Sequence, residues 1–156
     1  MNKPSQSRQE VCGQIRRAFA GVRLEDGIGL SEARGIDDHA DEKTLEACRQ
    51  RDEKQDWAAI SHESLAQYSD TMCFFDSKGM RFHLPAFMID GLTTERNFTV
   101  IFCLTHLSAW SMTKFADLTP AQRSAVRAFL LLLKDDDACT FEKPQIEAAL
   151  ANYWTE

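Results

Sequence analysis

Residues 71–92 read Thr-Met-Cys-Phe-Phe-Asp-Ser-Lys-Gly-Met-Arg-Phe-His-Leu-Pro-Ala-Phe-Met-Ile-Asp-Gly-Leu, and they carry the strongest local signals in the chain. Residues 72–75 are a short apolar run, and residues 76–79 are typical of a turn that ends in glycine. In residues 80–84 apolar and polar side chains alternate, as they do on a strand with one buried face. The stretch therefore predicts a β-hairpin.

Two further signals extend this hairpin into a sheet. Pro85 has no N–H to give to a strand ladder but fits the first turn of a helix, which we expect over residues 85–92. Residues 98–104 are continuously apolar and rich in β-branched and aromatic side chains, as in a buried central strand. The sequence thus predicts an α+β fold, a helix-dominated single domain over residues 1–156 with at least five helices flanking a small three-stranded sheet of about residues 72–75, 80–84 and 98–104.

Helix-start signals mark several of the flanking helices. Ser7-Arg8-Gln9-Glu10 has the spacing of a capping box and precedes an amphipathic pattern that should close near Gly21. Thr119-Pro120-Ala121-Gln122 starts a helix with a broad apolar stripe that should end near Lys134, and Pro144 opens a last helix.

The glycine-containing segment Asp26-Gly27-Ile28-Gly29-Leu30-Ser31 is interpreted as a connector with Ser31 as the N-cap of the next helix. A phosphate-binding loop is excluded here. Glu32 stands where a dinucleotide fingerprint has its third glycine, no Gly-Lys-Ser/Thr follows, and the segment comes after a helix instead of a strand.

One resemblance follows from residues 79–87, Gly-Met-Arg-Phe-His-Leu-Pro-Ala-Phe. Trp57-Ala58-Ala59-Ile60 and Leu65 precede them, and Leu118–Arg123 and Phe129-Leu130 follow. The pattern resembles a family of small bacterial proteins of unknown function that carry a Gly-Phe-Arg-Phe/Tyr-Tyr-Leu-Pro-Ala-Phe box, with Met80 and His83 replacing aromatic residues here. The match would cover residues 11–133. The resemblance implies no activity and no functional residues.

Composition narrows the functional classes. The chain has 156 residues and a formal net charge of −6, which argues against a nucleic-acid binder because phosphate backbones are held by clustered Lys and Arg. No window is long and apolar enough for a membrane helix, and the N-terminus lacks a secretory signal, so we expect a cytoplasmic protein. Its five cysteines are odd in number and widely spaced, and we expect all of them to be thiols.

Sequence motifs for catalysis, cofactors or metals are absent. There is no Gly-x-Ser-x-Gly elbow, and His39 has too few neighbouring ligands for a metal site. His62 and His106 stand alone in the sequence. We therefore expect no metal, no cofactor and, on balance, no enzymatic activity.

Two sets of polar residues are candidates for binding. Asp37, Asp38, Asp41 and Glu42 begin an acidic run that extends to Asp56 and could attract a basic partner, although such a run can also be a solvated surface. Arg81 and His83 lie two apart on the predicted strand and would share one face, where they could bind an anion or a carboxylate. They could equally be structural.

Two functional hypotheses follow. The first is a non-catalytic protein-binding domain, for instance an immunity-type antagonist of a bacterial toxin. The second is a small enzyme or an anion- or ligand-binding domain that uses Arg81 and His83 in a pocket. Either way we expect no nucleic acid and no membrane as a partner. The sequence leaves open whether the chain is a monomer or a dimer.

Overall fold

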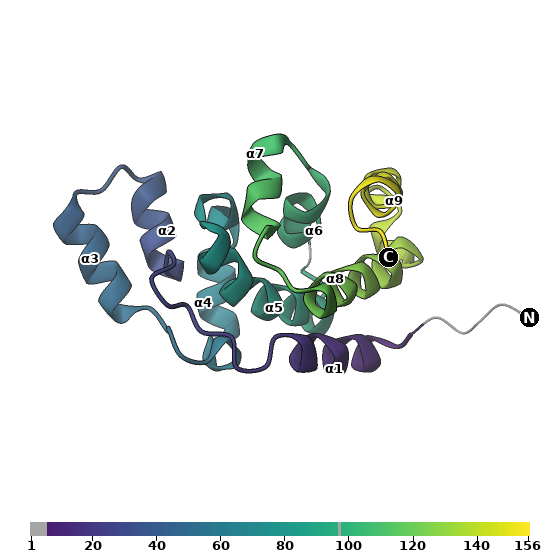
Figure 1. Cartoon of the computed structure of the whole chain (residues 1–156), viewed down its shortest axis with the longest axis horizontal. Coiled ribbons are helices and arrows are strands. Elements are labelled where there is room, and N and C mark those ends of the chain that lie inside the picture. The colour runs from purple at the N-terminus through teal and green to yellow at the C-terminus, as the bar shows by residue number, and fades with distance from the viewer. Residues whose placement is uncertain (1–5, 97) are drawn as a thin grey trace, which may run out of the picture.

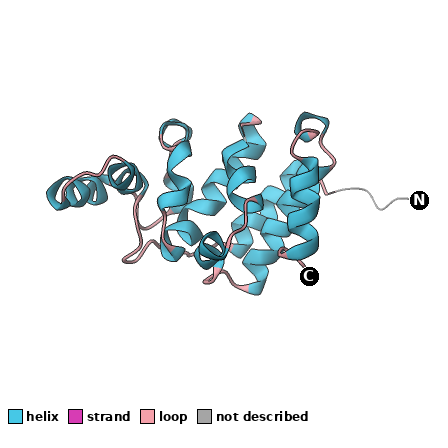
Figure 2. Ribbon diagram, turned by 90° about the horizontal axis from the view of Figure 1, so that it is seen from above, coloured by secondary structure: helices cyan, strands magenta, loops and turns pink. Residues whose placement is uncertain are grey.

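The computed structural model describes residues 6–96 and 98–156, and in these ranges it contains helices and loops but no strand (Figure 2). The α-helices are α1 (Arg8–Ala18), α2 (Leu30–Asp37), α3 (Glu42–Arg51), α4 (His62–Gln67), α5 (Ser77–Thr94), α6 (Phe98–Thr105), α7 (Ala109–Met112), α8 (Pro120–Lys134) and α9 (Lys143–Asn152). Short 3-10 helices separate some of them: η1 (Trp57–Ala59), η2 (Ser69–Phe74), η3 (Thr113–Phe115) and η4 (Asp137–Cys139).

Helix α5 is the centre of the packing. It contacts α1, α4, α6, η1 and η3, while α1 also packs on α8 and α8 on α9. Helices α2 and α3 form a pair at one end of the molecule, and α8 and α9 lie toward the other end (Figure 1). The core includes Phe19, Phe82 and Phe129, all with no exposed area.

The predicted α+β fold is wrong, and α5 gives the main reason. Residues 80–84, expected as a strand, lie inside this helix, and Pro85 sits in its middle instead of its first turn. Almost every residue from Gly79 to Met88 is buried, so the helix has no polar face that would produce a period of 3.6. The apparent alternation was misleading because His83 is as buried as the apolar residues around it.

The other two predicted strands are also helical. Residues 72–75 form the end of η2 and the residue after it, and residues 98–104 lie in α6. In α6 the side chains of Val100, Ile101 and Leu104 are buried, while Phe98 and Phe102 are exposed. A helix that is apolar on both its exposed and its buried face has a continuously apolar sequence, which is also typical of a strand buried on both faces.

The capping signals were more reliable. Ser7 and Thr119 both form capping boxes, with Glu10 and Gln122, and α8 ends at Lys134 as predicted. The prediction that Ser31 is an N-cap was wrong: Gly29 has that position in α2, and Ser31 lies inside the helix.

Candidate functional site

The four predicted acidic residues lie together on the turn between α2 and α3, and all are exposed. We call Asp37, Asp38, Asp41 and Glu42 the acidic turn. Asp41 is the N-cap of α3, and its carboxylate accepts a hydrogen bond from the Thr44 N–H at 2.8 Å. Hydrogen bonding from the Thr44 side chain, and then from this backbone N–H, lowers the pKa of Asp41 from its ordinary value. The acidic turn lies at the surface near one end of the molecule (Figure 1).

Arg81 and His83 do not share an open face. The His83 side chain has no exposed area; its ring stacks on Phe75 with centroids 4.3 Å apart and meets Phe82 edge-on. Its Nδ1 lies 2.7 Å from the Gly79 carbonyl oxygen, which can only accept, so Nδ1 carries the proton of the neutral ring. Burial lowers the pKa of His83 to about 4. Arg81 is half-buried, with a guanidinium nitrogen 3.8 Å from Glu25.

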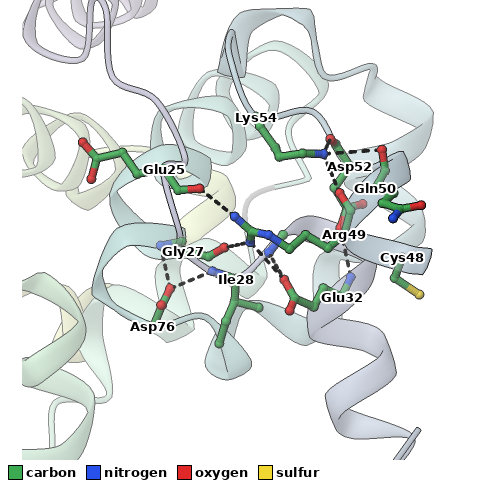
Figure 3. Close-up of polar contacts among 12 residues, drawn as sticks. Glu25, Gly27, Ile28, Glu32, Cys48, Arg49, Gln50, Asp52, Lys54 and Asp76 are labelled. Carbon is green, nitrogen blue, oxygen red and sulfur yellow. Dashed lines mark hydrogen bonds and ion pairs between the residues drawn. The ribbon is translucent and has the colours of Figure 1, made fainter. Parts of the chain in front are cut away.

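The glycine-containing connector is held by a polar network (Figure 3). The Arg49 guanidinium donates to the carbonyl oxygens of Glu25 and Gly27 and lies 3.4 Å from the Glu32 carboxylate. Asp76, the N-cap of α5, accepts from the backbone N–H of Ile28 at 3.0 Å. Arg49 and Asp76 thus tie the connector to α3 and α5.

The N-terminus of α2 is occupied by a side chain of the protein. The Asp52 carboxylate accepts from the backbone N–H groups of Ser31 at 2.9 Å and Glu32 at 3.0 Å, where an anionic ligand would bind at an open helix N-terminus. A Cβ on Gly29 would overlap this carboxylate. The network is therefore structural, and the glycines serve close packing.

Exposed aromatic side chains gather on α6 and α7. Phe98 and Phe102 are 62% and 50% exposed and lie one turn apart on α6, so they point to the same side of the helix. Trp110 on α7 is 64% exposed. Trp110 and Phe102 line one groove, and His106 stacks on Phe102 with centroids 3.8 Å apart. We call Phe98, Phe102 and Trp110 the α6 face.

The groove beside the α6 face is mainly apolar. It has a volume of about 250 Å³ and is lined by residues of η2, α6, α7 and η3, including Met72, Cys103 and Phe115. The buried Lys114 donates from Nζ to the Phe75 carbonyl oxygen, and its ammonium lies 4.1 Å from the centroid of the Trp110 ring. Burial raises the pKa of Cys103 to about 12, which keeps this thiol protonated and a poor nucleophile. The groove can therefore accommodate an apolar side chain, whereas Cys103 is unsuited to covalent chemistry.

A second groove borders the first part of α6. It has a volume of about 420 Å³, and Thr99 lines both grooves. His62 from α4 and Asp90 from α5 meet here, with His62 Nδ1 2.6 Å from Asp90 Oδ1. This pair could not be predicted from the sequence, because the two residues are 28 positions apart and meet only through the packing of α4 on α5. We call this space the His62 groove.

The described part of the chain shows neither a cluster of metal ligands nor a membrane-spanning helix. No group of three or more His, Cys, Asp or Glu side chains there could hold a metal ion. No described helix is both long enough and apolar enough to cross a membrane.

Comparison with known proteins places the chain in a family. Neither a curated protein nor a solved structure matches it. One family model, described as a family of unknown function (DUF6714), matches residues 7–156, a longer range than the sequence resemblance implied. Since the model covers nearly the whole chain, the protein belongs to the family of unknown function DUF6714.

Proposed function

We propose that this protein is a non-catalytic protein-binding domain and that the α6 face is its main contact surface. The observation that carries the proposal is the exposure of three large aromatic side chains, Phe98, Phe102 and Trp110, on neighbouring helices beside an apolar groove. Single exposed apolar residues are common on proteins, but aromatic clusters beside a groove are typical of binding surfaces.

The energetics favour this role. Aromatic side chains lose little conformational entropy on binding and bury a large area, and Trp and Tyr dominate the residues on which interfaces depend. The groove between Phe102 and Trp110 offers room for an apolar side chain of the partner. A partner with one apolar anchor for this groove would be held by contacts with both rings.

The acidic turn favours a partner of positive charge. Its four carboxylates are exposed and lie on a chain whose net charge is −6, so a basic protein would be attracted before contact. Such steering changes the association rate more than the lifetime of the complex. We therefore propose a basic protein as the partner.

We also propose more specific properties of this protein. They are a bacterial source, a box at residues 79–87 shared by the family, a cytoplasmic location and a role as an antagonist of a toxin. All four agree with a small acidic binding domain. The alternative function, a pocket built from Arg81 and His83, has no such support, because His83 is buried beneath Phe75 and Phe82.

The experiment compares variants of the bait protein in partner capture. Tagged parent protein and the variants Phe102→Ala, Trp110→Ala and Leu131→Ala are each incubated with lysate of the source organism, and bound proteins are quantified by mass spectrometry. Leu131 is a matched control because it is an exposed apolar residue on α8. A protein retained by the parent and by Leu131→Ala but lost with both aromatic variants supports the proposal. Equal recovery with all four baits contradicts it.

A further inference from the structure

The His62 groove combines apolar walls with several carboxylates. Leu65, Phe87 and Val100 are buried residues that line it, and the exposed ring of Phe98 lies at its edge. An extended aliphatic segment could lie along these walls while its polar end remains hydrated. The groove is therefore shaped for a long side chain with a polar tip.

The charges in the groove define that tip. Among the described residues that line it, Asp90, Glu95 and Glu142 are acidic and Arg96 is basic, while His62 is cationic only when protonated. Glu95 lies 3.9 Å from Arg8, but the Arg8 guanidinium is also paired with Asp136. Glu142 forms no ion pair within the described residues. Negative charge is thus in excess.

The pair formed by His62 and Asp90 fixes one of these carboxylates. The Asp90 side chain is 17% exposed, whereas the His62 side chain is 46% exposed. The hydrogen bond from His62 occupies Oδ1 of Asp90, and no described residue donates to Oδ2. A carboxylate held in this way keeps one oxygen available for a second donor at the cost of little reorganisation.

We propose that the His62 groove is the binding pocket for an arginine side chain of the partner protein. This inference rests on the proposed function and names the feature of the partner that the pocket recognises. The stem would lie against Leu65 and Phe87, the guanidinium plane could stack on Phe98, and its N–H groups would bond to Asp90 and Glu142.

The α6 face and the pocket form one continuous surface. Phe98 and Phe102 lie on the same side of α6, Phe98 lines the His62 groove and Phe102 lines the apolar groove. A partner segment that lies along α6 could therefore place an arginine in the His62 groove and an apolar side chain in the apolar groove. The net charge of the chain favours the same kind of segment.

The test uses a small probe and needs no knowledge of the partner. The full chain, labelled with nitrogen-15, is titrated with N-acetyl-arginine methylamide while backbone amide shifts are followed by NMR. The matched probe is N-acetyl-citrulline methylamide, in which a neutral urea replaces the guanidinium. We expect saturable shifts at Thr99, Val100 and Ala138 with the arginine probe, and at least about fivefold weaker binding of the citrulline probe, because the charge pairs are lost.

Charge variants test the assignment of the carboxylates. Glu142→Gln should weaken the arginine probe by about threefold to fivefold, and Asp90→Asn should do the same. Glu147→Gln is the control, since Glu147 is an exposed acid on α9 that does not line the groove, and it should leave binding unchanged. Melting curves of all three variants verify that the fold is intact.

Two outcomes overturn the inference. They are equal binding of the arginine and citrulline probes, and the absence of saturable shifts at the groove amides. Neither outcome touches the proposed function, because partner capture through Phe102 and Trp110 is measured without the probe. Conversely, probe binding with partner capture that is insensitive to both aromatic variants would retain the pocket and reject the α6 face.

Discussion

The buried His83 should make the stability of the protein depend on pH in a specific range. Burial lowers the pKa of His83 to about 4 in the folded chain, against 6.5 for the ordinary side chain. Because the folded state binds the proton less tightly than the unfolded state, lowering the pH favours unfolding. The contribution of His83 to stability is complete above pH 6.5 and is lost as the pH falls from 6.5 toward 4.

The size of the effect follows from the two pKa values. A difference of one in pKa corresponds to about 1.4 kcal/mol, so a fall from 6.5 to about 4 is worth about 3 kcal/mol when the loss is complete. Between pH 7.5 and pH 5 the loss should be about 2 kcal/mol. The cause is structural: the neutral ring donates through Nδ1 to Gly79, and Nε2 is buried with no partner in the described chain.

The assay is denaturant unfolding of the parent and of His83→Phe between pH 7.5 and pH 5. Phenylalanine keeps a ring between Phe75 and Phe82 but cannot be protonated. The parent should lose about 2 kcal/mol more than the variant over this range, whatever the difference between them at pH 7.5. His39→Asn is the control for the loss of a histidine, since His39 is exposed and has a positive φ that Asn also adopts. Equal losses in the parent and His83→Phe would refute the argument.

Three further predictions concern the fold. Phe129→Ala should lower the free energy of unfolding by about 3–5 kcal/mol, because it removes a fully buried aromatic side chain on α8. Ser124→Ala, on the exposed side of the same helix, should change this free energy by less than about 1 kcal/mol. Similar values for the two variants would mean that α8 is not central to the core. Gly29→Ala should destabilise by about 1–3 kcal/mol through overlap with the carboxylate at the α2 N-terminus. Gly13→Ala inside α1 should instead be neutral or stabilise the protein by up to about 1 kcal/mol, because only the flexible end of an arginine side chain must move. Thermal melts in which Gly29→Ala and Gly13→Ala destabilise the protein equally would contradict this prediction. Changing all four residues of the acidic turn to Asn and Gln should leave the melting temperature nearly unchanged, since Asn can still cap α3, and a drop of many degrees would show that the turn is structural.

Local signals with a defined geometry could be predicted from the sequence. A capping box requires a hydroxyl or carboxylate and a Glu or Gln at fixed spacing, so Ser7 and Thr119 marked the starts of α1 and α8 correctly. The acidic turn could also be located, because charged residues without apolar neighbours have no place in the core.

The sheet could not be rejected from the sequence, because α5 and α6 hide their helical period. Residues of α5 face protein on all sides, and α6 presents aromatic side chains to solvent. Pro85 strengthened the error, since a proline in the middle of a helix is uncommon.

The candidate sites depend on contacts between distant segments. His62 and Asp90 meet through the packing of α4 on α5, and the α6 face became visible only once Phe98 and Phe102 proved to be exposed. The predicted strand places Arg81 and His83 on one face, whereas in the helix α5 they point in different directions. Polar residue type alone did not distinguish a buried histidine from a surface one.

Photo-crosslinking in cells of the source organism tests directly whether the α6 face binds a partner protein. Benzoylphenylalanine is placed at position 102 on the α6 face or, as a control, at position 131 on α8; Phe102 is 50% exposed and Leu131 is 37% exposed. After irradiation the chain is purified under denaturing conditions, so that only covalent partners remain. We expect one dominant crosslinked protein, basic in composition, at position 102 and its absence at position 131. The same crosslinks at both positions, or none at position 102 in cells that contain the folded protein, would contradict the assignment of the α6 face as a binding surface.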